Sequence, residues 1–205
     1  MKVDLKKQIP SYTAPRGRFE IIDVPSLRYL MVDGHGDPNA ARSYSEAVSA
    51  LYGVSYKLKF LSRNDLGRDY VVMPLEGLWW SDDMSTFTTA RDKSRWSWTM
   101  MILVPEWLGP EQVEQARDAA GAKGDLPALD TLRLASLEEG RCVQTLHVGS
   151  YDDEGPVLDA MHHDFIPGEG LRMRGVHHEI YLADPRRSAP EKLRTILRQP
   201  VEEDW

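Results

Sequence analysis

An acidic and a phenolic side chain share one face of an apolar run near the C-terminus. Residues 177–181 read HHEIY. Side chains alternate between the two faces of a strand, so Glu179 and Tyr181 point the same way, about 7 Å apart along the chain. Such a pair can work as an acid–base pair, with the carboxylate as general base, or it can form a binding site. The alternative is a solvated face, because antiparallel sheets commonly have one wet side.

The surroundings of Glu179 decide between these functions. A carboxylate that is desolvated and unpaired in an aromatic pocket is suited to take a proton near neutral pH, or to pair with a cationic ligand. The structural alternative is a salt bridge to a nearby arginine, such as Arg172 or Arg174. Tyr181 can donate a hydrogen bond to a ligand carbonyl, or it can simply form part of the pocket wall.

Tryptophan is concentrated in one part of the chain. Five of the six tryptophans fall between residues 79 and 107. Trp96 and Trp98 are two positions apart, so in a strand both indoles lie on one face and form an aromatic wall. Trp79 and Trp80 are adjacent, so only one of them faces a common groove. Such a wall either packs in the core or lines a pocket for a flat or cationic ligand.

Two further residues complete the set of candidate ligand contacts. Tyr151 follows a glycine turn and can reach the mouth of a groove, and His177 lies next to the acid–phenol pair. We predict Glu179 and Tyr181 as catalytic residues. The predicted ligand contacts are Trp79, Trp80, Trp96, Trp98, Tyr151 and His177.

The sequence has no motif typical of a metal site, a cysteine nucleophile or a serine hydrolase. The histidine pairs at 162–163 and 177–178 are adjacent, and no spacing typical of a zinc site occurs, so we expect neither a metal nor a cofactor. Cys142 lies in an apolar run and is expected to be a small buried residue rather than a nucleophile. A Gly-x-Ser-x-Gly elbow is also lacking, which argues against a serine hydrolase.

The net charge and hydropathy of the chain argue against nucleic acids and membranes as binding partners. A chain of 205 residues with a net charge of −7 is poorly suited to bind nucleic acid, because phosphate binding needs a basic surface. No apolar run approaches the roughly 18 residues that span a membrane. The charged N-terminus lacks the apolar segment of a signal peptide, so a cytoplasmic location is expected.

Hydrophobic periodicity predicts a mixed order of elements. Helices are expected at residues 43–61, 110–121 and 154–165. Strands are expected at 27–32, 69–74, 76–80, 96–104, 131–135, 141–148, 175–182 and 192–201. The order strand, glycine turn, helix and two strands occurs twice.

This repetition predicts an α+β fold of duplicated β-α-β-β units with pseudo-twofold symmetry. We expect a mainly antiparallel sheet, helices on one face and a central ligand cleft. The chain is predicted to form a single domain. Residues 1–20 would be an irregular lead-in, residues 21–105 the first half, and residues 106–205 the second half.

Several segments resemble the GyrI-like small-molecule-binding domain family. They are the Gly-x-Tyr turn at 149–151, the Glu-Ile-Tyr-Leu-x-Asp-Pro run at 179–185 and the segment 190–195. The run Pro-Leu-Glu-Gly-Leu-Trp-Trp at 74–80 is similar to the stand-alone members of the family. Together the resemblance spans about residues 20–200.

The resemblance implies a groove that takes planar, hydrophobic and often cationic compounds, with the glutamate that matches Glu179 at its base and aromatic side chains as walls. Some relatives carry a helix-turn-helix domain, for which the residues before the first strand leave no room. Stand-alone relatives include drug binders, hydrolases of cyclopropane-bearing genotoxins, and a protein that shields DNA gyrase.

Three functions remain open at this stage. The leading one is hydrolytic opening of a strained cyclopropane, with Glu179 activating water and Tyr181 bonding to the carbonyl oxygen. The second is a non-catalytic sink or sensor for the same compounds. The third is a protein-interaction role such as gyrase shielding, which the acidic charge permits but does not select.

Overall fold

The structure is a computed structural model that describes residues 2–82 and 92–204. Contacts between segments divide the chain into two units. The first unit contains Met1–Ile9, Leu27–Leu75 and Trp80–Leu137, and the second contains Pro10–Ser26, Glu76–Trp79 and Glu138–Trp205. The prediction of a single domain stays a prediction.

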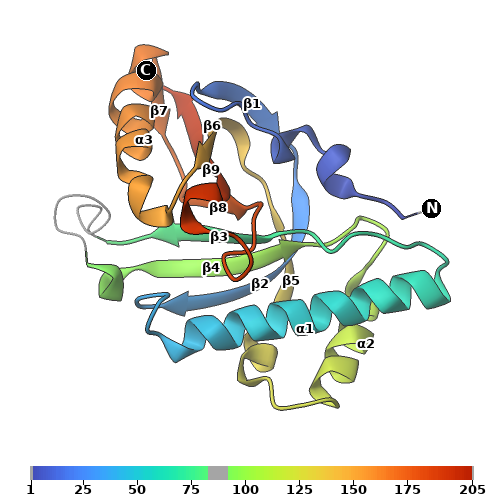
Figure 1. Ribbon diagram of the computed structural model, residues 1–205. Coiled ribbons are helices and arrows are strands. Elements are labelled where there is room, and N and C mark those ends of the chain that lie inside the picture. Colours follow the sequence, from blue (N-terminus) through green and yellow to red (C-terminus); the bar gives the residue numbers. More distant parts are fainter. Residues whose placement is uncertain (1, 83–91, 205) are drawn as a thin grey trace. The chain divides into compact units, whose positions relative to one another are not determined.

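The first unit is an antiparallel sheet with two helices. Strand β2 (Leu27–His35) lies between β4 (Ser97–Leu103) and β5 (Arg133–Leu137). Helix α1 (Arg42–Asp65) packs along β2 and β4, and α2 (Pro110–Gly121) packs on α1 (Figure 1). Short 3₁₀ helices occupy Leu5–Lys7, Lys93–Arg95 and Pro127–Thr131.

Helix α1 forms because its apolar residues recur at the helical spacing of three and four. Its buried side chains include Ala47, Ala50, Leu51, Val54 and Leu58. Helix α2 begins at Pro110, a residue favoured in the first turn, where its missing N–H costs nothing. The helices predicted at residues 43–61 and 110–121 are thereby confirmed.

Gly34 provides space for a buried tryptophan in this unit. Gly34 lies opposite Trp98 in the β2–β4 pair, and a Cβ added to Gly34 would stand 2.0 Å from the indole ring. Trp98 is fully buried, with the Tyr44 ring edge-on at 5.3 Å between centroids. The glycine therefore allows the indole to lie directly on the backbone.

We expect Gly34→Ala to lower the free energy of unfolding by about 1–3 kcal/mol, because the added methyl group overpacks the core. Denaturant unfolding followed by tryptophan fluorescence measures this loss. Gly124→Ala is the matched control, since a Cβ there meets nothing within 4 Å. Equal stability of the two variants would contradict the packing described here.

The second unit is a larger antiparallel sheet. Its strand order is β1 (Glu20–Val24), β6 (Gly140–Val148), β9 (Arg194–Glu203), β8 (His177–Tyr181) and β3 (Leu75–Trp80), of which Glu76–Trp79 belong to this unit. Strand β7 (Leu171–Met173) pairs with the far end of β9. Further 3₁₀ helices occupy Pro10–Tyr12, Tyr151–Asp153 and Pro190–Lys192.

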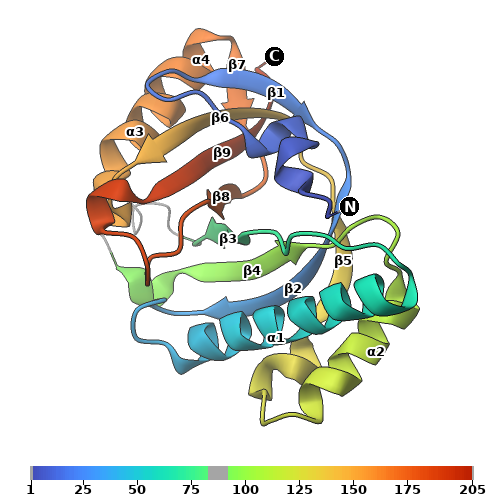
Figure 2. The same cartoon turned by 45° about the vertical axis from the view of Figure 1, so that its right-hand side comes forward.

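A continuous helical segment covers one face of this sheet. It runs from α3 (Gly155–Asp159) through a π-helical turn (Ala160–Phe165) into α4 (Ile166–Gly168) and lies along β6 and β9 (Figure 2). Its apolar side chains meet those of the sheet in one core cluster. The buried members of this cluster are Val143, Met161, Ile166, Leu171, Leu197 and Val201.

The predicted fold class is confirmed: the chain is α+β, and the strand ladders within both units are antiparallel. The strand expected at 69–74 is wrong. Among the described residues this segment forms a single isolated bridge, between Tyr70 and Val3, and so lacks the partner strand that a ladder needs. Two strands were missed, Glu20–Val24 and Leu171–Met173.

The environment of Cys142 matches the expectation of a small buried residue. Cys142 is buried, and burial raises the pKa of its thiol to about 12, as expected of a packing residue. No helix within residues 2–82 and 92–204 is long and apolar enough to cross a bilayer.

Candidate functional site

Strand β8 presents different chemistry on its two faces. His177, Glu179 and Tyr181 alternate with the fully buried His178 and Ile180. The pairing with β3 and β9 sets the neighbours of the first face. Trp79 lies opposite His177, and Thr195 lies opposite Tyr181. The alternation expected from the sequence is therefore present in the structure.

The acid and the phenol are in direct contact. The Tyr181 hydroxyl donates to Oε2 of Glu179 at 2.7 Å, and it accepts from Nε1 of Trp79 at 2.9 Å. The other carboxylate oxygen, Oε1, lies 3.3 Å from Nε2 of His177, without hydrogen-bonding geometry. The Glu179 side chain is only 15% exposed, so this position is not part of a solvated face.

Neither nearby arginine neutralises Glu179. Arg172 pairs with Glu202 at 2.8 Å. Arg174 donates to the backbone oxygens of Val201 and Glu139. The carboxylate instead has a phenol and an imidazole as its neighbours, and both can exchange protons with it.

Gly77 explains how an indole and a phenol can meet beside the acid. It lies opposite Glu179 in the β3–β8 pair. A Cβ at this position would stand 2.7 Å from Nε1 of Trp79 and 3.1 Å from the Tyr181 hydroxyl. Tyr151 adds a third aromatic ring, edge-on to Tyr181 at 5.6 Å between centroids. Four predicted site residues therefore adjoin one another: Glu179, Tyr181, Trp79 and His177, with Tyr151 beside them.

The remaining predicted tryptophans belong to the first unit. Trp98 is fully buried and donates to the backbone oxygen of Gly36 at 3.2 Å. Trp96 is half-buried, with Nζ of Lys93 5.7 Å from its ring centroid, and Trp80 is also half-buried. Trp79 is the member of the adjacent pair that shares the face of Glu179. A ligand role for Trp80, Trp96 and Trp98 stays a prediction.

The opposite face of β8 carries a buried ionic network that the sequence analysis missed. His178 is fully buried between two carboxylates, with Nε2 2.9 Å from Glu76 and Nδ1 2.9 Å from Glu139. Arg198 is also buried, and its Nη1 lies 2.8 Å from Glu139. The signal that could have revealed it is a histidine and an arginine at inward positions of apolar strands, since buried charges are normally paired.

The network shifts the pKa values of His178 and Glu139. Burial alone would lower the pKa of His178, but Glu139 and Glu76 outweigh burial and raise it. Burial likewise opposes ionisation of Glu139, but His178 and Arg198 hold the pKa of this carboxyl down to about 2. The Tyr12 hydroxyl donates to Glu76, which ties the N-terminal segment to this face.

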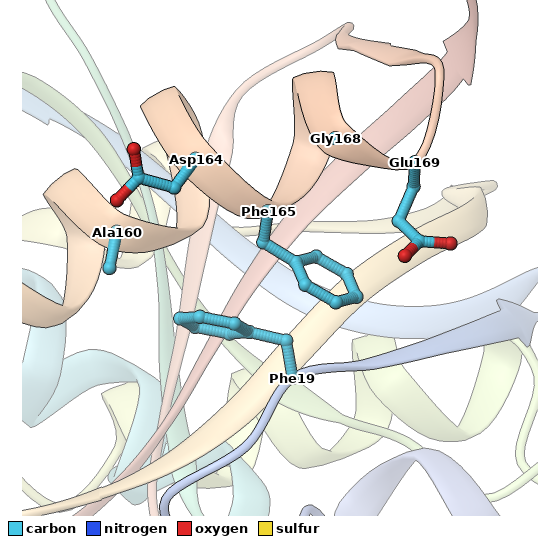
Figure 3. Close-up of a pocket in the computed structure, with 6 residues that line it drawn as sticks. All are labelled: Phe19, Ala160, Asp164, Phe165, Gly168 and Glu169. Carbon is cyan, nitrogen blue, oxygen red and sulfur yellow. The ribbon is translucent and has the colours of Figure 1, made fainter.

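A surface pocket in the same unit lies apart from these residues. It is lined by Phe19, Ala160, Asp164, Phe165, Gly168 and Glu169 (Figure 3). Phe19 and Phe165 pack with ring centroids 5.1 Å apart and also join the core cluster. Its lining includes none of the predicted site residues, so the chemistry of the Glu179 cluster identifies the candidate site better than surface shape does.

The sequence of the chain matches a known protein family. Residues 18–202 match the model of the GyrI-like small molecule binding domain. The chain belongs to this family. A search of curated proteins finds no significant match. The resemblance inferred from the 179–185 run is thereby confirmed over almost the whole chain.

Solved structures from Listeria innocua are similar to this GyrI-like chain along its length. An uncharacterized conserved protein is 40% identical, with a TM-score of 0.89, covering 98% of this chain and 100% of the other. A hydrolase is 38% identical, with a TM-score of 0.85 and the same coverage. The EcmrR C-terminal domain is 10% identical with a TM-score of 0.54, covering 91% of this chain and 98% of the other, which shows shared fold alone.

Proposed function

We propose that this GyrI-like protein binds planar apolar compounds beside Glu179 and hydrolyses those that carry a strained cyclopropane. One observation carries the proposal: the Glu179 carboxylate is held by Tyr181, which is itself held by Trp79, while His177 flanks the other oxygen. The similarity to structures described as hydrolases supports a hydrolytic reaction.

The reaction would begin with a proton transfer. Glu179 takes a proton from a water molecule, and the water oxygen forms a bond to the methylene carbon of the cyclopropane. The strained carbon–carbon bond breaks, and its electron pair moves into the conjugated carbonyl, which becomes a phenolate. Glu179 gives up its proton to solvent and the phenolate takes one from solvent, which completes the addition of one water molecule and regenerates the carboxylate.

The aromatic side chains around Glu179 would contact the ligand and orient the carboxylate. Trp79 and Tyr151 offer apolar surface to a flat ligand and limit access of bulk water. The Tyr181 hydroxyl donates its single proton to Glu179 and so keeps the carboxylate oriented; it would have to release Glu179 to bond the carbonyl oxygen that gains negative charge. Relief of strain and aromatisation lower the intrinsic barrier, so general base catalysis of about 10²–10⁴-fold suffices.

Mass spectrometry tests the proposal directly. We expect the purified protein to convert a planar alkylator, whose cyclopropane is conjugated to a carbonyl, into a product heavier by one water. The same compound in buffer gives the uncatalysed rate. Recovery of the compound unchanged, together with saturable binding, would overturn hydrolysis and favour a binding sink, which the family description also suits.

A further inference from the structure

Three buried imidazole nitrogens belong to two neighbouring histidines, His162 and His177, and Nε2 of His177 lies 3.3 Å from Glu179. Within the described residues, neither ring nitrogen of His177 has a hydrogen-bond partner, nor has Nε2 of His162. The two rings meet edge-to-face, with centroids 6.0 Å apart and an interplanar angle of 81°. A buried polar atom without a partner costs about 1–3 kcal/mol, so three in one place call for a physical explanation.

His162 reaches this position from the helix that covers the sheet. It lies in the π-helical turn Ala160–Phe165, and π turns within α-helices occur frequently at functional sites. Its neighbour His163 turns outward, is 65% exposed and pairs with Asp159. Adjacent histidines on one turn therefore have opposite environments.

His162 is suited to form hydrogen bonds as a neutral imidazole. Burial, with contributions from His177 and His163, lowers the pKa of His162 to about 3, and Asp159 opposes this shift only weakly. At neutral pH its imidazole is therefore uncharged, and its free nitrogen can donate or accept a single hydrogen bond, depending on the tautomer.

We propose that His162 and His177 are positioning residues that hold a water molecule against Oε1 of Glu179, and that this water is the nucleophile. The inference rests on the proposed function. A bound water needs two to four polar partners, and the two imidazoles and the carboxylate supply three. His177 flanks the oxygen that Tyr181 leaves free, so that oxygen is the one that takes the proton.

A small polar molecule fits this place better than a metal ion. Over residues 2–82 and 92–204 no three His, Cys, Asp or Glu side chains converge in a way that could hold a metal. Water needs only one hydrogen bond from each partner, and it tolerates angles that a metal ion would not.

A crystal structure that resolves ordered water gives the first test, which is independent of activity. We expect a water oxygen within about 3.2 Å of Nε2 of His162, a ring nitrogen of His177 and Oε1 of Glu179. Imidazole nitrogens that contact only protein atoms, or that ligate a metal ion, would overturn the inference.

Kinetics gives the second test. His162→Leu removes one hydrogen bond and should lower kcat about tenfold with KM unchanged. His162→Gln should recover most of this loss, because its side-chain amide can take the place of Nε2. His163→Leu, one residue away and exposed, is the matched control and should keep the parent kcat.

These outcomes separate the two proposals. If the parent protein hydrolyses no cyclopropane substrate, the proposed function fails, and the crystallographic water still decides whether the subsite exists. If the parent protein is active and His162→Leu keeps full kcat, the positioning role alone fails. A raised KM with unchanged kcat would also contradict it.

Discussion

Glu179→Gln should reduce the rate of cyclopropane hydrolysis by about 10²–10⁴-fold, the usual contribution of a general base. The amide keeps the shape of the side chain, and its oxygen can still accept from Tyr181, so the local structure should survive. The amide cannot take a proton from water. We therefore expect the loss in kcat, with ligand affinity nearly unchanged.

Single-turnover kinetics with mass-spectrometric detection measures this effect. Glu191→Gln is the control, because Glu191 is an exposed carboxylate in the 3₁₀ helix Pro190–Lys192 of the same unit. Both variants should unfold at similar denaturant concentrations. Parent-like turnover by Glu179→Gln would show that another group activates the water.

The second large effect concerns the buried ionic network. His178→Leu leaves Glu76 and Glu139 without the imidazole between them, inside the fold. Removing one partner from a buried ion pair typically costs about 3–5 kcal/mol. We expect a loss of this size in the free energy of unfolding, measured with denaturant near pH 6. His163→Leu, which alters an exposed histidine, should change stability far less.

The pH dependence of this loss identifies its electrostatic origin. The raised pKa of His178 means that its contribution is complete below the unfolded value of 6.5 and is lost as pH rises through the folded pKa. The pKa of Glu139 falls from 4.5 to about 2, so its contribution is complete above 4.5 and is lost as pH falls toward 2.

The stability gap between the parent protein and His178→Leu should therefore be widest between about pH 4.5 and 6.5 and should narrow on both sides. Denaturant unfolding at a series of pH values measures this gap. A gap that stayed constant from pH 3 to pH 9 would indicate a packing defect rather than loss of charge pairing.

The alternation of side chains along β8 could be predicted from the sequence because it depends only on residues that are neighbours in the chain. Alternation alone placed Glu179 and Tyr181 on one face and His178 and Ile180 on the other. The same rule separated Trp79 from Trp80. Family resemblance and hydrophobic periodicity together predicted the antiparallel α+β class. These inferences needed no knowledge of which strands pair.

The missed features all depend on partners distant in the chain. His178 meets Glu76 across 102 positions and Glu139 across 39, and no local pattern encodes such a contact. The run at 69–74 has apolar residues typical of a strand, yet whether it joins a ladder depends on a partner. His162 meets His177 from a π-helical turn, and hydrophobic periodicity does not predict such a turn.

Strand β8 carries neighbouring residues with incompatible surroundings. His178 belongs between carboxylates, and Glu179 belongs beside a phenol, on opposite sides of one strand. Inserting or deleting a single residue before His178 would exchange these surroundings, placing the carboxylate of Glu179 among Glu76 and Glu139. Homologues that acquire new ligand preferences are thus expected to do so through substitutions in this strand, while changes of loop length accumulate elsewhere.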